Sequence, residues 1–209
     1  MIRLLIADDH AVVREGLSRI FGEVPDLEVV AEAASGDDVL AAVAQNQVDV
    51  VLLDISMPGL PFLQLLRDLE THHPEARVLV LSMHSEDQYA VRAFRAGAAG
   101  YVTKDRSPEE ILDAIRTVHR GARYVSHAVE KRLVSRGSGL RRLPHETLSD
   151  REYEVLCLLG AGTSLKDIAA RLTLSPKTVS TYRSRIMEKM AFHSNADIVR
   201  YVIEQRLSG

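Results

Sequence analysis

The chain has 209 residues, of which 46% are hydrophobic and 26% are charged. This length suits two ordinary domains, and the composition excludes a largely disordered chain. No apolar run approaches the roughly 18–20 residues that a membrane-spanning helix requires, so we expect no membrane partner. The single cysteine, Cys157, fits a reducing compartment, and we expect a cytoplasmic protein.

The net charge of −3 is distributed unevenly along the chain. Residues 1–130 carry 12 Lys and Arg against 21 Asp and Glu, a net charge of −9. Residues 131–143 carry five basic residues and no acid, and residues 144–209 carry nine basic and eight acidic residues. The basic centre and the less acidic C-terminal part hint at nucleic-acid binding there.

The first half alternates apolar strands with amphipathic helices. We predict strands at Leu4–Ala7, Leu27–Ala31, Val48–Leu53, Arg77–Leu81 and Gly100–Val102. Helices are predicted after them, at about 10–22, 36–45, 60–71, 86–96 and 107–120. Near-continuous apolar runs are typical of strands buried on both faces. Five strand–helix repeats therefore predict an α/β fold, with a five-stranded doubly wound parallel sheet of the flavodoxin type.

The strand–helix pattern stops at residues 121–146. The stretch GARYVSHAVEKRLVSR can add one short helix, and GSGLRRLPHE is predicted to be a flexible linker. We therefore expect a first domain at 1–120, a linker at 121–146 and a second, small all-α domain at 147–209.

The second domain carries signals for helix ends. Ser149 with Glu152 forms a capping box, and Ser194 with Asp197 opens a final helix. Between them come the short helix KDIAARL, a tight turn, and the helix PKTVSTYRSRIMEKM, which Ser175 caps. A short helix, a turn and a well-capped longer helix predict a helix-turn-helix.

Polar side chains gather at the predicted strand ends of the first domain. Asp8 and Asp9 follow the first strand, and Asp54 follows the third. The carboxyl ends of adjacent parallel strands meet at one edge, so we expect the three carboxylates to converge. Such hard oxygen donors suit Mg²⁺. Ser82 and Lys104 follow the fourth and fifth strands, which completes a set of groups suited to phosphoryl transfer onto a carboxylate.

Each of these residues also has a simpler interpretation. A pair of aspartates after a strand is more often a turn or a helix cap, and a lone lysine there is usually solvated. The coincidence of five such residues at four strand ends favours the phosphoryl-transfer site. His10 is a further candidate metal ligand, but its place at the start of a helix favours the rim of the pocket.

Several motifs resemble a known family. LLIADDH, VVLLDISMPG, VLVLSMH and AGAAGYVTKD resemble the receiver domains of two-component response regulators. LSDREYEVLCLLGAGTSLKDIAARLTLSPKTVSTYRSRIMEKM resembles the LuxR-type helix-turn-helix. Across nearly the whole chain, the combination resembles the NarL/FixJ family.

The resemblance implies roles for individual residues. Asp54 would be the phosphoacceptor, and Mg²⁺ would bind Asp8, Asp9, Asp54 and the main-chain carbonyl of Ser56. Ser82 and Lys104 would contact the phosphoryl group, and Tyr101 would be an aromatic switch that turns inward. Phe62 stands where the family usually has glycine, so we expect a different loop after Asp54. Met83 would narrow access to the pocket, and His84 would position or block an attacking water.

The helix PKTVSTYRSRIMEKM has two distinct faces. Its predicted core face carries Val179, Tyr182, Ile186 and Met190. Its polar face carries Lys177, Ser180, Thr181, Ser184 and Arg185, with Arg183 at the flank. An ordinary surface helix is the alternative, but the helix-turn-helix context favours the major groove of double-stranded DNA. By family position, Ser180, Thr181 and Ser184 would read bases, while Lys166, Lys177, Arg183 and Arg185 would anchor phosphates.

The predicted function follows from both halves. The resemblance implies that a sensor histidine kinase phosphorylates the receiver and that phosphorylation controls sequence-specific DNA binding and transcription. We expect a homodimer on phosphorylation or on DNA, with RNA polymerase as a further candidate partner. The final helix, with Ile198, Tyr201 and Val202 on one face, would serve dimerisation or only packing. The acidic receiver and basic linker also fit a closed form that phosphorylation opens.

Three alternatives are weaker. An orphan regulator that is never phosphorylated would not need the complete residue set. An aspartate-nucleophile phosphatase requires a second carboxylate two residues after its nucleophile, where this chain has Ser56; we therefore expect no enzyme. An RNA-binding output domain would need exposed aromatic residues for base stacking.

Overall fold

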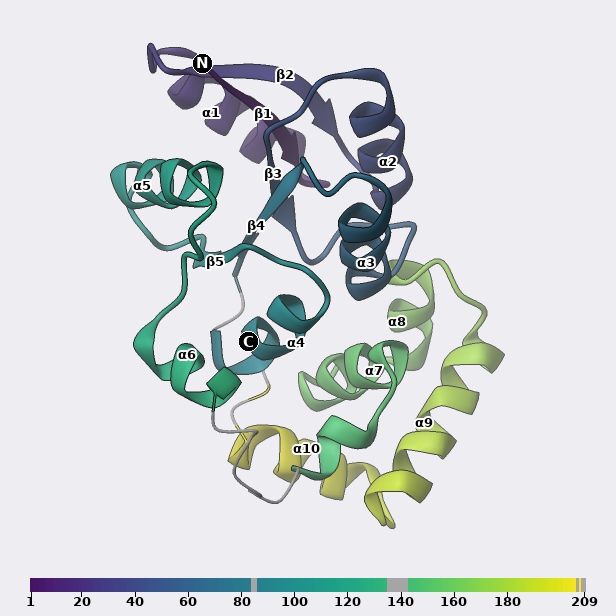
Figure 1. Cartoon of the computed structure of the whole chain (residues 1–209). Helices are drawn as coiled ribbons and strands as arrows, with labels where there is room; N and C mark the ends of the chain where they lie inside the picture. The colour runs from purple at the N-terminus through teal and green to yellow at the C-terminus, as the bar shows by residue number, and fades with distance from the viewer. Residues whose placement is uncertain (84–85, 135–142, 206, 208–209) are drawn as a thin grey trace. The chain divides into compact units, whose positions relative to one another are not determined.

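The computed structural model describes residues 1–83, 86–134, 143–205 and 207. It divides into two compact units, Met1–Lys131 and Arg132–Gly209 (Figure 1). Within the described ranges, no helix combines the length and the apolar character needed to cross a membrane.

The first unit is built on a five-stranded parallel sheet. Its strands are β1 (Ile2–Ala7), β2 (Leu27–Ala33), β3 (Val50–Asp54), β4 (Arg77–Ser82) and β5 (Gly100–Thr103). Their order is β2-β1-β3-β4-β5, so the direction of the winding reverses between β1 and β3. Ligands of such sheets bind outside the carboxyl ends of the strands at this reversal.

Helices cover both faces of the sheet (Figure 1). They are α1 (Ala11–Gly22), α2 (Gly36–Gln45), α3 (Phe62–His72), α4 (Glu86–Arg95) and α5 (Pro108–His119), followed by α6 (His127–Val134). On one face, Phe21 of α1 and Ile115 of α5 pack against β-strand residues such as Leu4 and Leu52. The predicted α/β fold is confirmed, and β3 and β4 extend one residue further than predicted, to Asp54 and Ser82.

The segment after α5 returns to the edge of the sheet. The Tyr101 N–H donates to the Tyr124 carbonyl and the Tyr124 N–H donates to the Ala99 carbonyl, both at 3.1 Å. Gly100 permits this approach, because a Cβ there would lie 2.7 Å from Leu79 Cδ1 and 3.1 Å from Tyr124 Cβ. The first part of the predicted linker therefore belongs to the first compact unit, and α6 is the short helix expected there.

The second unit is helical. A 3₁₀ turn, η2 (Pro144–Thr147), precedes α7 (Asp150–Gly160), α8 (Leu165–Arg171), α9 (Pro176–Met190) and α10 (Asn195–Glu204). Serine caps all four α-helices through its side chain, at positions 149, 164, 175 and 194. Reciprocal capping boxes form at Ser149 with Glu152 and at Ser194 with Asp197. The helix starts predicted from Ser149, Ser175 and Ser194 are confirmed, and the cap of α8 by Ser164 was not predicted.

α7 and α10 pack closely in the second unit. A Cβ at Gly160 would lie 2.3 Å from Val202 Cγ1, so only glycine permits this distance between the helices. Ile198 and Val202 are fully buried, and Cys157 is 6% exposed. The face of α10 that carries Ile198 and Val202 therefore packs within the unit, and Cys157 is the core residue that its apolar neighbours predict.

Candidate functional site

Acidic side chains converge at the carboxyl edge of the central strands. Asp8 follows β1 and is 2% exposed, and Asp54 ends β3 and is 4% exposed. Ligand atoms of Asp8, Asp9, His10 and Asp54 all lie within 4.8 Å of one another. The structure thus forms an acidic pocket that is compatible with a divalent metal ion, and its carboxylate oxygens are donors of the hard type that Mg²⁺ prefers.

Lys104 supplies the positive charge of this pocket. Its Nζ atom lies 2.5 Å from Asp8 Oδ2 and 3.2 Å from Asp54 Oδ2. The Lys104 N–H also donates to the Ser82 carbonyl at 2.8 Å, which fixes the start of the loop after β5. The ammonium group therefore bridges the ends of β1 and β3 from a loop anchored on β4.

Asp54 and Lys104 each influence the other's pKa. Burial is the largest influence on Asp54 and raises its pKa; Lys104 lowers it, Asp8 raises it, and the pKa stays above its ordinary value. Burial lowers the pKa of Lys104, but the hydrogen bond and the attraction of Asp8 and Asp54 outweigh it, and the Lys104 pKa is raised. Lys104 consequently remains an ammonium group at neutral pH.

Ser82 and Ser56 lie beside Asp54. Ser82 is fully buried, one residue beyond the β4 position paired with Asp54. Tyr101 is 1% exposed and pairs in register with Val80 of β4, so its ring is buried within the first unit. The Ser56 backbone N–H hydrogen-bonds the Asp54 carboxylate and lowers its pKa. The structure thus brings the side chains of five predicted residues to one strand edge: Asp8, Asp9, Asp54, Ser82 and Lys104.

His10 and Arg14 also contact the pocket; sequence reasoning placed His10 at the pocket rim and missed Arg14. His10 begins α1, and its Nδ1 atom lies 2.8 Å from Asp9 Oδ1 and 3.2 Å from Asp8 Oδ1. Arg14 donates from Nη1 to the Asp8 carbonyl at 2.6 Å and lies 3.5 Å from Glu32. Arg14 lies four residues after His10, about one helical turn, so the sequence could have indicated that both residues face the pocket.

In the loop after Asp54, the residue with a positive φ is Gly59 and not residue 62. Gly59 has φ of 91°, and Phe62 begins α3 with its ring buried. The chain therefore turns without a glycine at position 62. Met83 is 75% exposed, and His84 lies outside the described residues.

Comparisons with known proteins agree with this geometry. Residues 4–116, more than half of the chain, match the response regulator receiver domain, and residues 146–202 match the luxR family of bacterial regulatory proteins. The chain belongs to the NarL/FixJ family of response regulators. It joins a receiver to a LuxR-type DNA-binding domain, so phosphorylation of a receiver aspartate by a sensor histidine kinase controls sequence-specific DNA binding and transcription.

Relatives match this response regulator over nearly its whole length. The response regulator UvrY of Escherichia coli K12 is 34% identical over 209 residues, which cover 99% of this chain and 96% of UvrY. The response regulator GacA of Pseudomonas aeruginosa PAO1 is 37% identical over 200 residues, which cover 95% of this chain and 94% of GacA.

Solved structures share the fold. RcsB of Salmonella typhimurium has a TM-score of 0.73 at 24% identity, covering 100% of this chain and 98% of that one. The response regulator ChrA of a heme-sensing two-component system has a TM-score of 0.52 at 34% identity, covering 99% of this chain and 98% of that one.

In the LuxR-type domain, α8 and α9 form the helix-turn-helix. Thr173, between them, has φ of 54° and makes the tight turn. Val179, Ile186 and Met190 are buried as predicted, whereas Tyr182 is only half-buried. The exposed residues of the predicted DNA face are Lys166, Lys177, Thr181, Ser184 and Arg185, while Ser180 and Arg183 are half-buried.

Hydrogen bonds within α9 limit what its hydroxyl groups can offer to DNA. Thr181 Oγ1 donates to the Lys177 carbonyl at 3.0 Å, and Ser184 Oγ donates to the Ser180 carbonyl at 3.1 Å. Each hydroxyl proton is therefore used inside the helix, and each oxygen keeps its acceptor capacity. Arg183 Nε donates to Asn195 Oδ1 at 2.7 Å, which orients its guanidinium group towards the start of α10.

Proposed function

We propose that Asp54 is the phosphoacceptor of this response regulator and that Asp8, Asp9 and Lys104 prepare it for the reaction. The observation that supports the proposal is the bridge from the Lys104 ammonium group to both Asp8 and Asp54 at the strand edge. Among the residues that the structure describes, this is the place where a buried carboxylate, further acids and a half-buried ammonium group come together.

The proposed reaction moves a phosphoryl group from a phosphohistidine of the kinase to Asp54. An Asp54 carboxylate oxygen forms a bond to phosphorus, while the bond between phosphorus and the histidine nitrogen breaks and its electron pair returns to the imidazole. Lys104 Nζ and the Ser82 hydroxyl donate to the phosphoryl oxygens as their charge develops. Asp8, Asp9, Asp54 and the Ser56 carbonyl would hold Mg²⁺, which would supply further positive charge there. The chemistry alters the protein itself, so we do not class it as an enzyme.

The proposed output is DNA binding through α9 as a dimer. Solved complexes of RcsB include one with promoter DNA in the presence of BeF3⁻ and one with two RcsB dimers on two parallel DNAs, and they share the fold of this chain. We propose that Ser180, Thr181 and Ser184 contact base edges, and that Lys166, Lys177, Arg183 and Arg185 contact phosphates. RNA polymerase is a further proposed partner, and the bacterial cytoplasm, where the DNA lies, is the proposed location. We retain the proposed domains 1–120 and 147–209, joined by residues 121–146, the first part of which packs with the first compact unit.

The experiment that tests the phosphoacceptor is intact mass spectrometry after incubation with acetyl phosphate and Mg²⁺. The wild-type chain should gain one phosphoryl group, and Asp54→Asn should gain none. Asp113→Asn, which removes an exposed carboxylate of α5, is the matched control and should label normally. Asp9→Asn should lose labelling because it removes a metal ligand. Undiminished labelling of Asp54→Asn would disprove the assignment.

A further inference from the structure

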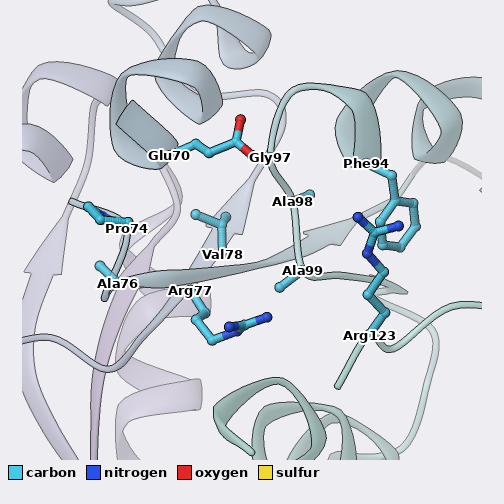
Figure 2. A pocket seen from close by; sticks show the side chains of 10 residues that line it. All are labelled: Glu70, Pro74, Ala76, Arg77, Val78, Phe94, Gly97, Ala98, Ala99 and Arg123. Atoms are coloured by element: carbon cyan, nitrogen blue, oxygen red, sulfur yellow. The ribbon is translucent and has the colours of Figure 1, made fainter. Parts of the chain in front are cut away.

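A second polar cavity lies at the opposite edge of the sheet from Asp54. Its volume is about 270 Å³, and it opens between the start of β4, the end of α3 and the loop between α4 and β5 (Figure 2). Its lining residues are Glu70, Pro74, Ala76, Arg77, Val78, Phe94, Gly97, Ala98, Ala99 and Arg123. A water molecule occupies about 30 Å³ of the liquid, so the cavity has room for a small organic molecule.

Arg77 has an unsatisfied donor at this cavity. Its Nε atom is the one buried side-chain nitrogen or oxygen without a hydrogen-bond partner in the described part of the chain. The same guanidinium group donates from Nη2 to the Gly121 carbonyl at 3.2 Å, which fixes its orientation. A buried N–H without an acceptor is unfavourable, so a ligand that approaches Arg77 and supplies an acceptor would be stabilised here.

The charges of the cavity favour an anion. Arg77 and Arg123 both line it, and Glu70 is its single acidic residue (Figure 2). Across the residues that the structure describes, neither Arg123 nor Glu70 forms an ion pair. Two guanidinium groups against one carboxylate leave a net positive charge, and guanidinium matches the planar oxygens of carboxylates and the oxygens of phosphates.

Local backbone geometry places Glu70 on the cavity wall. Gly97 has φ of 106°, and a Cβ there would lie 2.8 Å from Glu70 Oε2. The Glu70 carboxylate thus lies against Gly97, as Figure 2 shows. Val78, Phe94 and Ala98 are buried and supply an apolar wall. A charged end and an apolar wall suit an organic anion better than a bare inorganic ion.

The cavity is separate from the phosphoacceptor pocket. Arg77 pairs in register with Val50, four residues before Asp54 on β3. At about 3.3 Å per residue, Arg77 and Asp54 are about 13 Å apart along the strand direction. Binding at one site can therefore be measured independently of binding at the other.

We propose that this cavity is a binding site for a small organic anion that carries a carboxylate or phosphate group. The anionic group accepts hydrogen bonds from Arg77 Nε and from Arg123, and a short carbon body lies along Phe94 and Val78. This site goes beyond the proposed phosphorylation and DNA binding, and it does not depend on either of them.

The test is a titration of the ¹⁵N-labelled full chain without Mg²⁺, followed by NMR chemical shifts. The probes are butanoate and glycerol 3-phosphate, with orthophosphate as the inorganic comparison and sodium chloride at equal ionic strength as the control. The amides of Val78, Gly97 and Arg123 should shift and saturate with at least one organic probe, and sodium chloride should not reproduce this. A stronger response to butanoate or to glycerol 3-phosphate identifies the anionic group as carboxylate or phosphate.

Variants separate specific binding from general charge attraction. Arg77→Lys keeps the charge but removes the Nε donor and should weaken binding at least about 5-fold. Arg123→Gln, at an exposed position, should also weaken it, and Glu70→Gln should tighten it about 2-fold by removing repulsion. Arg19→Lys, at an exposed position of α1, is the matched control and should bind as wild type.

Three outcomes would overturn the proposal. The first is the absence of saturable shifts at the cavity with both organic probes. The second is shifts confined to Asp54 and Lys104, which would mean that the anion enters the phosphoacceptor pocket. The third is unchanged affinity in Arg123→Gln, a surface variant whose fold can be checked by its unchanged spectrum elsewhere.

Discussion

At the residue scale, Asp54 combines near-complete burial with a second carboxylate and one ammonium group. Burial in the metal-free pocket is the main cause of the raised Asp54 pKa; Lys104 lowers this pKa, and repulsion from Asp8 raises it further. A residue that is held ready for reaction in this way lowers the stability of the protein that contains it.

Replacing Asp54 with asparagine should therefore stabilise the metal-free protein. Without Mg²⁺, we expect Asp54→Asn to raise the free energy of unfolding by about 1 kcal/mol, which corresponds to a few degrees in Tm. Adding Mg²⁺ should raise the Tm of the wild type and have little effect on the variant, because the variant lacks one of the proposed ligands. Thermal unfolding in EDTA and in Mg²⁺ measures both effects. A lower Tm for the variant in EDTA would contradict this account of the pocket.

A second carboxylate, Glu152, shows the opposite behaviour. It is 2% exposed, accepts a hydrogen bond from the Ser149 N–H at 2.7 Å, and pairs with Lys189 Nζ at 2.7 Å. Burial raises its pKa, but Lys189 and Ser149 outweigh burial, and the Glu152 pKa is lowered. A lowered carboxyl pKa in the folded state contributes stability above the pKa of the unfolded state, and that contribution is lost as the pH falls through the folded pKa.

Glu152→Gln should consequently destabilise the LuxR-type domain in a pH-dependent manner. We expect a loss of about 1–2 kcal/mol at pH 7, because the ion pair with Lys189 disappears while the Ser149 cap partly remains. The difference from wild type should shrink when the pH falls below the ordinary glutamate value of 4.5. Thermal unfolding at several pH values measures it, with Glu188→Gln, at an exposed position on α9, as the control. A difference that is constant with pH would show that the charge of Glu152 is unimportant.

At the scale of the elements, helix starts were predictable and contacts between elements were not. Serine caps and apolar runs are local signals, so the boundaries of α7, α9 and α10 follow from a few neighbouring residues. The convergence at Asp54 was also predictable, because adjacent parallel strands bring their ends together. In contrast, the Arg183–Asn195 hydrogen bond and the half-buried position of Tyr182 depend on how α10 packs beside α9.

The pairing of Tyr124 with β5 was not predictable for the same reason. Its partners Ala99 and Tyr101 lie more than 20 residues earlier in the chain, across the whole of α5. Likewise, Lys104 contacts Asp8 as well as Asp54 because its backbone N–H is hydrogen-bonded to the Ser82 carbonyl, which positions the loop after β5. Sequence patterns locate elements and the residues at their ends, whereas pair distances follow from packing.

The recognition helix α9 divides into positions that should affect DNA binding differently. Lys177 and Arg185 are exposed cations, so replacing either by alanine should weaken binding to all sequences and reduce the salt dependence by about one unit of slope. Thr181 and Ser184 have their protons engaged inside the helix, so they offer acceptors and, for Thr181, a methyl group. Thr181→Ala and Ser184→Ala should change the preference between sites.

Fluorescence anisotropy with several DNA sequences, at three salt concentrations, distinguishes these effects. Glu204→Gln, at an exposed position on α10, is the control and should bind all sequences as wild type. If the lysine and arginine variants changed only the sequence preference, the division of the face into phosphate-contacting and base-contacting positions would be wrong.

At the scale of the whole molecule, phosphorylation must change the affinity for DNA by favouring one state of the chain. We expect the phosphorylated full chain to bind two half-sites, about 10 base pairs apart, some 5- to 150-fold more tightly than the unphosphorylated chain. Asp54→Asn should show no increase after treatment with acetyl phosphate. Equal affinities of the two wild-type forms would contradict this coupling.

The dependence on protein concentration separates two mechanisms for that increase. If phosphorylation acts only through dimerisation, the difference should vanish at concentrations where both forms are dimers by sedimentation. If the acidic receiver restrains the basic DNA-binding part, the difference should persist there and diminish with salt.

The pairing of Tyr124 with β5 also has a consequence for colloidal behaviour. An outer strand with open N–H and carbonyl groups is a template on which a foreign strand can add, and this is a common route to aggregation. In this protein, the chain's own backbone engages the start of β5 through Ala99 and Tyr101. In the proposed dimer on DNA, this stretch is already engaged in each copy, so we expect the two copies to associate through side chains and not by adding strands.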